Sequence, residues 1–223
     1  MKEAVVPRHL PECIVAKGIE IHELAKVKKE TILYIQPCAS ERGRLMADIE
    51  LAPDVERFFD QRALCRLLDV HRRRFSYLRC SENLGVAKFT LKGREVSVFR
   101  NGKLKIQRGL SREDLMKTAS GVTRLVWPAV ICPVCERAAV FCANGSCGKC
   151  VNGEEKIKID EIEGAEILLQ SLELLAKAGG EPAEGEQMLQ RARFFALQFI
   201  VESRGKKDAA VGMKILADAG GWE

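Results

Sequence analysis

Cysteine is the residue type in this sequence with the clearest capacity for chemistry. Five of the nine cysteines in the 223 residues are crowded into residues 132–150. In a secreted chain such crowding predicts disulfides, whereas in a reducing compartment it indicates metal binding or redox chemistry. The odd total and the tight clustering favour metal binding, because two thiolates separated by two residues can both bind one ion or one edge of a cluster. The candidate ligands are Cys132, Cys135, Cys142, Cys147 and Cys150.

Four of these cysteines fit a structural zinc site. Cys132 and Cys135 form one CxxC pair, and Cys147 and Cys150 form a second pair after eleven intervening residues. This arrangement approximates a zinc ribbon, in which two pairs of thiolates hold one Zn²⁺ ion in a tetrahedron. Cys142 has no role in this interpretation.

A second interpretation begins at Cys142. The spacing Cys142-x4-Cys147-x2-Cys150 is that of plant-type ferredoxins, and Cys-Ala-Asn-Gly-Ser-Cys-Gly-Lys-Cys resembles the [2Fe–2S] cluster loop of that family. In the family the loop follows a hairpin and a helix, as we expect here. No cysteine follows Cys150, so the fourth ligand would come from Cys132 or Cys135. We favour an iron–sulfur cluster, [2Fe–2S] or [4Fe–4S], over Zn²⁺, because it uses Cys142 and accounts for the residues of the loop.

The other four cysteines lie outside this cluster. Cys38 and Cys80 are at the ends of expected strands, from which they could approach the metal site or hold a second centre, although half-buried structural thiols are the plainer interpretation. Cys13 and Cys65 are interpreted as structural. The Cys-Pro-Val-Cys motif at 132–135 also resembles a glutaredoxin active site, but a lone redox dithiol would leave the three cysteines that follow it without a role.

Beyond the cysteines, the densest basic run is Arg72, Arg73 and Arg74, with Tyr77 nearby. Such a run can contact phosphate or a partner, although a solvated turn is the plainer interpretation. The sequence holds no phosphate-binding loop, dinucleotide fingerprint, HExxH motif or nucleophile elbow. We therefore assign no catalytic residue and expect a protein that is not an enzyme.

Charge and hydropathy restrict the class of protein further. The net charge is +5, and residues 1–110 hold 22 Lys/Arg against 14 Asp/Glu. A basic half can face nucleic acid or an acidic partner, but the modest excess and the 6% aromatic content favour a protein partner or multi-subunit complex over nucleic acid. No apolar run reaches the roughly 18–20 residues of a membrane span, and residues 1–12 do not resemble a signal peptide. We expect a cytoplasmic protein that does not associate with membranes.

Local patterns predict an α+β fold with a small antiparallel sheet and packed helices. A helix is predicted to begin at Pro53-Asp54, and Ser111 with Asp114 predicts the start of another that runs to about residue 120. Asn101-Gly102 predicts a type I′ turn between two strands. The strands are expected at 31–36, 45–51, 75–79, 86–91, 95–100 and 103–108.

Composition divides the chain into four segments: an N-terminal arm (1–30), an α+β domain (31–128), a cysteine-rich metal-binding module (129–155) and a C-terminal helical segment (156–223). The working hypothesis is an iron–sulfur-binding accessory protein for electron transfer or cluster delivery within a larger complex. The alternative is a zinc-ribbon adaptor that binds nucleic acid or a protein assembly.

Overall fold

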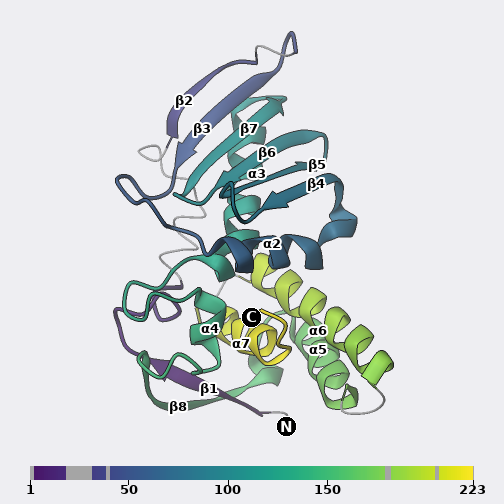
Figure 1. Ribbon diagram of the computed structural model, residues 1–223. Coiled ribbons are helices and arrows are strands. Elements are labelled where there is room, and N and C mark those ends of the chain that lie inside the picture. The colour runs from purple at the N-terminus through teal and green to yellow at the C-terminus, as the bar shows by residue number, and fades with distance from the viewer. Residues whose placement is uncertain (1–2, 19–31, 39–40, 179–181, 204–205, 223) are drawn as a thin grey trace. The chain divides into compact units, whose positions relative to one another are not determined.

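In the computed structural model the chain forms two structural units (Figure 1). The sheet unit is Glu20–Ile131, and the cysteine unit combines Met1–Ile19 with Cys132–Glu223. The sheet unit is therefore an insertion between the two segments of the cysteine unit. Helices and antiparallel strands occur together, which confirms the predicted α+β class. The structure describes residues 3–18, 32–38, 41–178, 182–203 and 206–222.

The sheet unit is built on a six-stranded antiparallel sheet with the order β2-β3-β7-β6-β5-β4. Side chains alternate between its faces, so that Leu104 and Ile106 of one strand are buried while Lys103 is exposed. The predicted strands are all present, with small shifts at their ends. Their bounds are Ile32–Pro37 (β2), Leu45–Glu50 (β3), Phe75–Ser81 (β4), Val86–Leu91 (β5), Arg94–Phe99 (β6) and Lys103–Gly109 (β7).

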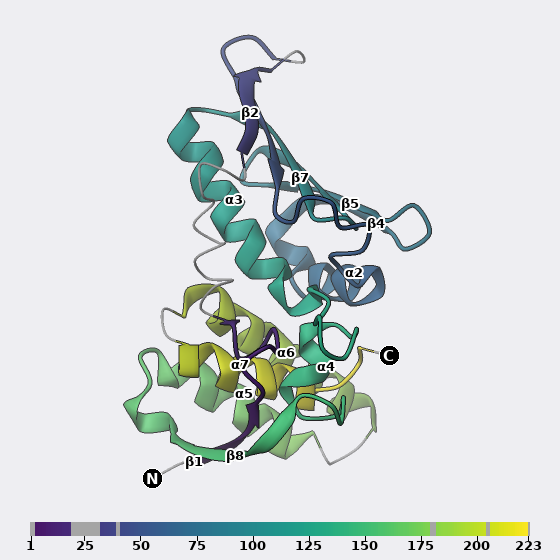
Figure 2. The same ribbon diagram turned by 90° about the vertical axis from the view of Figure 1, so that its left-hand side faces the viewer.

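Helices α2 (Gln61–Val70) and α3 (Arg112–Val126) contact each other and pack on the sheet, α2 against β4 and β5 and α3 against β3 and β7. Figure 2 shows α3 lying along one face of the sheet. The Ser111 side chain accepts a hydrogen bond of 3.1 Å from the Asp114 amide, which confirms the predicted helix cap. Arg94 on β6 donates two hydrogen bonds to the Asp114 carboxylate, at 2.7 and 2.9 Å, and thereby holds the start of α3 against the sheet.

Two local predictions for the sheet unit are wrong. The helix predicted from Pro53-Asp54 begins only at Gln61, where the Asp60 side chain caps it by accepting from Ala63 at 2.9 Å. Asp54 has a φ of 60°, which an α-helix does not accommodate.

The hairpin between β6 and β7 is present, but its turn is not type I′. A type I′ turn needs positive φ at both central residues, whereas in this turn only Gly102, at 88°, has it. The Gly102 amide donates to the Phe99 carbonyl at 3.0 Å, so the loop has three residues and ends on a glycine in the left-handed region. Phe58 lies within 3.2 Å of where a Cβ on Gly102 would stand, so the residue must also be small.

The cysteine unit combines a two-stranded ladder with helices. Antiparallel strands β1 (Glu3–His9) and β8 (Val151–Lys158) form the ladder, and the sequence predicted neither. The predicted C-terminal helices are present as α5 (Ala165–Lys177), α6 (Pro182–Glu202) and α7 (Lys206–Asp218), with α5 packed on α6 and α6 on α7. A short helix, α4 (Ala139–Ala143), contacts α7. In the described part of the chain, no helix has the length and apolar character required to cross a bilayer.

The four segments expected from composition distribute over these two units as follows. The described part of the arm, the module from Cys132 onward and the helical segment all belong to the cysteine unit. Residues 19–30, which end the arm, and residue 31, the first of the next segment, lie outside the described residues. The segment 31–128 lies within the sheet unit.

Candidate metal centre

Six cysteine thiols converge in the cysteine unit, as two groups of four. Within each group, all sulfur atoms lie within 4.8 Å of one another. The groups share two members, Cys142 and Cys150. The first group is Cys13, Cys132, Cys142 and Cys150, and the second is Cys135, Cys142, Cys147 and Cys150.

Every one of the five cysteines predicted as ligands belongs to at least one group. Cys13, which the sequence interpretation treated as structural, is the sixth member. Its sulfur lies 3.9 Å from that of Cys132, a residue 119 positions further along the chain. Spacing analysis finds ligands that are close in sequence, so it could not have found this one.

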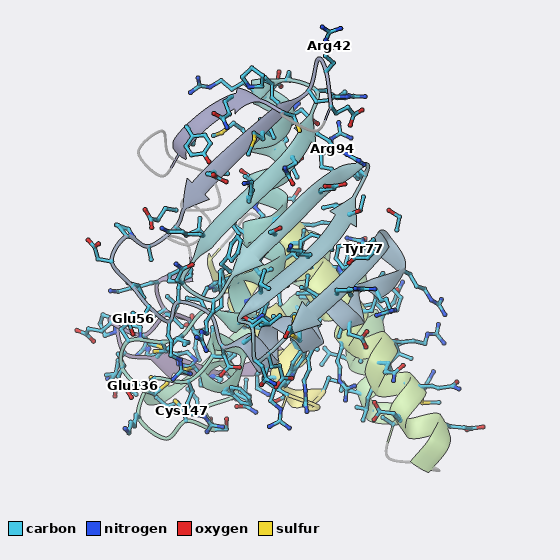
Figure 3. All side chains as sticks on the ribbon, turned by 45° about the horizontal axis from the view of Figure 1, so that its top comes forward. Arg42, Glu56, Tyr77, Arg94, Glu136 and Cys147 are labelled. Atoms are coloured by element: carbon cyan, nitrogen blue, oxygen red, sulfur yellow. A yellow bond between two sulfur atoms is a disulfide. The ribbon has the colours of Figure 1, made fainter. Side chains whose placement is uncertain are left out.

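The thiols differ in their access to solvent. Cys13, Cys132, Cys142 and Cys150 have no exposed surface, and Cys135 is 7% exposed. Cys147 is only half-buried. Figure 3 labels this residue, and also Glu136. The first group is thus enclosed, whereas the second reaches the surface through Cys147.

Tight turns place the first CxxC pair. The Glu136 amide donates to the Cys132 carbonyl at 2.8 Å, and the Cys132 amide donates to the Arg137 carbonyl at 2.8 Å. Glu136, which follows Cys135 directly, has a φ of 59°. This reversal turns the Cys132 and Cys135 side chains inward, and the short helix α4 then brings Cys142 to the same place.

The second pair is placed by glycine turns. Gly145 and Gly148 have φ values of 82° and 68°, in the left-handed region that favours glycine. Their amides donate to the carbonyls of Cys142 (2.9 Å) and Gly145 (3.1 Å) respectively. The Ser146 hydroxyl donates to the Phe141 carbonyl at 2.7 Å, which ties the loop back to α4.

Cys13 reaches the centre through the ladder between β1 and β8. The Leu10 amide donates to the Cys150 carbonyl at 2.8 Å, and the Cys13 amide donates to the Leu10 carbonyl at 3.0 Å. The His9 Nδ1 atom lies 3.6 Å from the Cys13 sulfur. Strand pairing therefore brings a candidate ligand from the N-terminal segment beside the candidate ligands of residues 132–150.

Without metal, the crowded thiols share their protons. Hydrogen bonding to Cys13, followed by burial, raises the pKa of Cys142, and burial raises the pKa of Cys150. The hydrogen bond from Cys142, assisted by His9, lowers the pKa of Cys13 despite its burial. A metal ion requires thiolates as ligands, so its binding must displace protons from Cys142 and Cys150.

The two additional cysteines considered as ligands lie elsewhere. Cys80 is joined to Cys65 in a disulfide that links β4 to α2, with the Cα atoms 5.5 Å apart. Cys38 is a buried cysteine of the sheet unit that forms no disulfide and belongs to neither group. The thiol of Cys80 is therefore not available as a ligand in this structure.

The Cys65–Cys80 disulfide should stabilise the sheet unit. It closes a loop of 15 residues, for which the loss of chain entropy in the unfolded state corresponds to about 3 kcal/mol. We expect Cys65→Ala with Cys80→Ala to lower the free energy of unfolding by about 2–4 kcal/mol in denaturant titrations. Cys38→Ala, which removes a thiol of the same unit that is not in a disulfide, is the control. Equal stability of the double variant and the parent would contradict the assignment.

The basic run Arg72, Arg73 and Arg74 forms a short 3-10 turn between α2 and β4, with all three residues exposed. Arg72 forms an ion pair with Asp69 at 3.5 Å. On β4, Tyr77 is 46% exposed, and the Arg79 guanidinium lies 5.7 Å from the centre of its ring. These residues form a basic surface of the sheet unit.

Comparison with known proteins was made at the level of families, sequences and structures. No family model, curated protein or solved structure matches this chain. The loop 142–150 that resembles a ferredoxin cluster loop lies in the cysteine unit, whereas the hairpin and helix that precede it in sequence, β6–β7 and α3, lie in the sheet unit. The strand that follows the loop is β8, which pairs with β1.

Proposed function

We propose that this protein is a non-catalytic adaptor whose cysteine unit is organised by a resident metal–thiolate centre and whose sheet unit docks a protein partner. The observation that carries the proposal is the convergence of six thiols, five of them buried, from two distant segments of the chain. Packing of the core does not by itself require so many thiols in one place, because small apolar residues could fill the same space. Deprotonated and bound to metal, the same thiols hold the two segments together.

The spacing of the sulfur atoms favours Zn²⁺ as the metal. A tetrahedral ion with metal–sulfur bonds of about 2.3 Å places its thiolates about 3.8 Å apart. The sulfur of Cys132 lies 3.9 Å from that of Cys13 and 3.8 Å from that of Cys150. An iron–sulfur cluster places inorganic sulfide and further iron atoms between its thiolates, which spreads those bound to different irons further apart. The sulfurs of Cys135 and Cys142 in the second group lie only 3.1 Å apart and would have to separate to bind one ion. Groups in which all four sulfurs lie within 4.8 Å of one another are better suited to single ions than to a cluster.

An iron–sulfur protein for electron transfer or cluster delivery is the second candidate. The loop Cys142-x4-Cys147-x2-Cys150 has the ferredoxin spacing, and its two glycines have the left-handed backbone that lets amides approach sulfur. Half-buried Cys147 would give a cluster a route for electron exchange with a partner.

Metal analysis after anaerobic purification separates the two candidates. We expect colourless protein that contains zinc and lacks acid-labile sulfide. Brown protein with broad visible absorption, and with iron and sulfide in near-equal amounts, would replace the zinc adaptor by the iron–sulfur protein. Protein without any bound metal would contradict both.

The face of the sheet opposite the helices suggests the chemistry of the partner. Arg79, Lys88 and Lys105 occupy one row across β4, β5 and β7, with Ser97 of β6 between the lysines and Asp48 of β3 opposite Lys105. Arg79 and Lys88 are direct cross-strand neighbours, an arrangement that costs stability unless an anion compensates it. A depression of about 320 Å³ beside this row is lined by Tyr77, Lys88, Glu95 and Gln107, among others. An acidic protein surface fits such a face.

Nucleic acid is the less favoured partner. Generic single-stranded RNA should bind only weakly near physiological salt, because the cationic row is short and Glu95 interrupts its surroundings. Fluorescence anisotropy of labelled RNA at low and physiological salt measures this. Sub-micromolar binding at physiological salt that is lost in Arg72→Ala, Arg73→Ala, Arg74→Ala protein would instead support a nucleic-acid adaptor.

A further inference from the structure

We infer that the centre holds two Zn²⁺ ions per chain, bridged by the thiolates of Cys142 and Cys150. This inference depends on the proposed metal-binding function and extends it from the presence of metal to the number of ions and their connection. Three observations carry it: the membership of the two sulfur groups, the number of buried thiols, and the charge that each arrangement would leave in the interior.

The membership of the groups matches two four-coordinate ions. Zn²⁺ in a structural site takes four ligands, so one ion cannot use all six thiols. Two separate ions would need eight thiolates, and six lie together. If the two ions share two thiolates, six thiolates are enough to give each ion four ligands. The terminal ligands of the first ion are Cys13 and Cys132, and those of the second are Cys135 and Cys147.

A single ion would leave two thiols without a purpose. An ion in the first group leaves Cys135 and Cys147, and an ion in the second leaves Cys13 and Cys132. An ion in the second group alone is the less favourable arrangement, because it leaves two buried thiols unused. Cys13 and Cys132 have no exposed surface. The turn from Leu10 to Cys13 would then place the Cys13 sulfur beside the centre without binding a metal ion.

The charge balance permits the second ion. One Zn²⁺ with four thiolates carries a net charge of −2. Adding a second Zn²⁺ with two further thiolates adds two positive and two negative charges, so the net charge stays at −2. An enclosed site therefore holds six thiolates in place of four without burying additional net charge, which is the costly quantity in a protein interior.

The two ions would differ in exposure. The ion held by Cys13 and Cys132 is enclosed by ligands from both segments of the unit, whereas Cys147 brings the other ion near the surface. Chelators should therefore reach the ion between Cys135 and Cys147 first. The enclosed ion is the one that attaches the N-terminal segment.

Native mass spectrometry of the full chain loaded with Zn²⁺ tests the number of ions. We expect two ions per chain in the parent and in Cys38→Ser, the control for loss of a buried thiol outside the centre. Cys13→Ser and Cys147→Ser should each retain one ion, because each removes a terminal ligand of one ion only. Cys142→Ser should weaken the binding of both ions, because the Cys142 thiolate bridges them.

Cadmium substitution tests the bridge in the parent protein, without any variant that could fail to fold. Two ¹¹³Cd resonances that split each other through shared sulfur are expected. One ion per chain, or two resonances without mutual coupling, would overturn the bridged pair and leave the metal-binding proposal standing. A chain that binds neither Zn²⁺ nor Cd²⁺ would overturn both proposals, and iron with sulfide would replace the pair by a cluster.

Discussion

Cys150→Ser should yield protein that retains almost no metal and has a disordered cysteine unit. Cys150 belongs to both sulfur groups and to both interpretations of the sequence, so no four-thiolate site survives its loss in full. Structural Zn²⁺ contributes apparent binding free energies of about 10–16 kcal/mol in small zinc domains, which is as large as the whole stability of a typical domain. Loss of this ligand should therefore have one of the largest effects of any single substitution in the chain, matched by loss of Cys142, the other shared thiol.

The matched control is Cys38→Ser, which changes a buried thiol of the sheet unit that is not in a disulfide. Metal content by mass spectrometry with inductively coupled plasma, together with the near-ultraviolet circular dichroism of each variant, provides the measurement. Full metal content in Cys150→Ser, or equal loss in both variants, would show that the six thiols do not hold the ion.

Metal removal from the intact protein should have the second largest effect, and its effect should be local. Hydrogen exchange is expected to accelerate across residues 3–18 and 132–158, because the pairing of β1 with β8 depends on a centre that joins the two segments. Where free metal exceeds its dissociation constant about 1,000-fold, binding stabilises the folded state by about 4 kcal/mol. Exchange through opening of this segment should then be about 1,000-fold faster in the apo form.

The sheet unit should be unaffected by metal removal, because its core is complete without the centre. Phe89, Leu104 and Leu115 are at most 1% exposed, and the disulfide links α2 to β4. Helices α5 to α7 have their own apolar contacts, among them Leu168, Leu197 and Ile200, none of which is exposed. Equal protection of residues 132–158 in the two forms would mean that metal does not organise the segment. Global unfolding would mean that the centre supports both units.

Features that depend on neighbours in sequence could be predicted. Ser111 and Asp114 form a helix cap within four residues. The glycines of the 142–150 loop require only local backbone geometry, and five of the six converging thiols lie within 19 residues of one another. In each case the residues that interact are close enough for their types and spacing to define the contact.

Features that depend on distant partners could not be predicted. Strand β8 (Val-Asn-Gly-Glu-Glu-Lys-Ile-Lys) is largely exposed and shows little apolar alternation, so only its pairing with β1 makes it a strand. Cys13 becomes a candidate ligand through that same pairing. The disulfide likewise depends on packing of α2 against β4, which brings Cys65 and Cys80 within bonding distance.

The position of the sheet unit within the chain gives the centre a wider structural role. Cys13 lies shortly before the end of the first segment of the cysteine unit at Ile19, and Cys132 is the first residue of the second segment. The insertion thus leaves and re-enters the unit close to two ligands of the first sulfur group. A metal ion bound by Cys13 and Cys132 would join the two segments of the cysteine unit.

Anomalous scattering at the zinc absorption edge from crystals of the protein, purified without added metal, tests the central claim most directly. The account predicts zinc density among the sulfurs of Cys13, Cys132, Cys142 and Cys150, with the neighbouring group occupied through the same two shared thiolates. A centre without anomalous density at the zinc or iron edge, whose six cysteines are free thiols or disulfides, would contradict it.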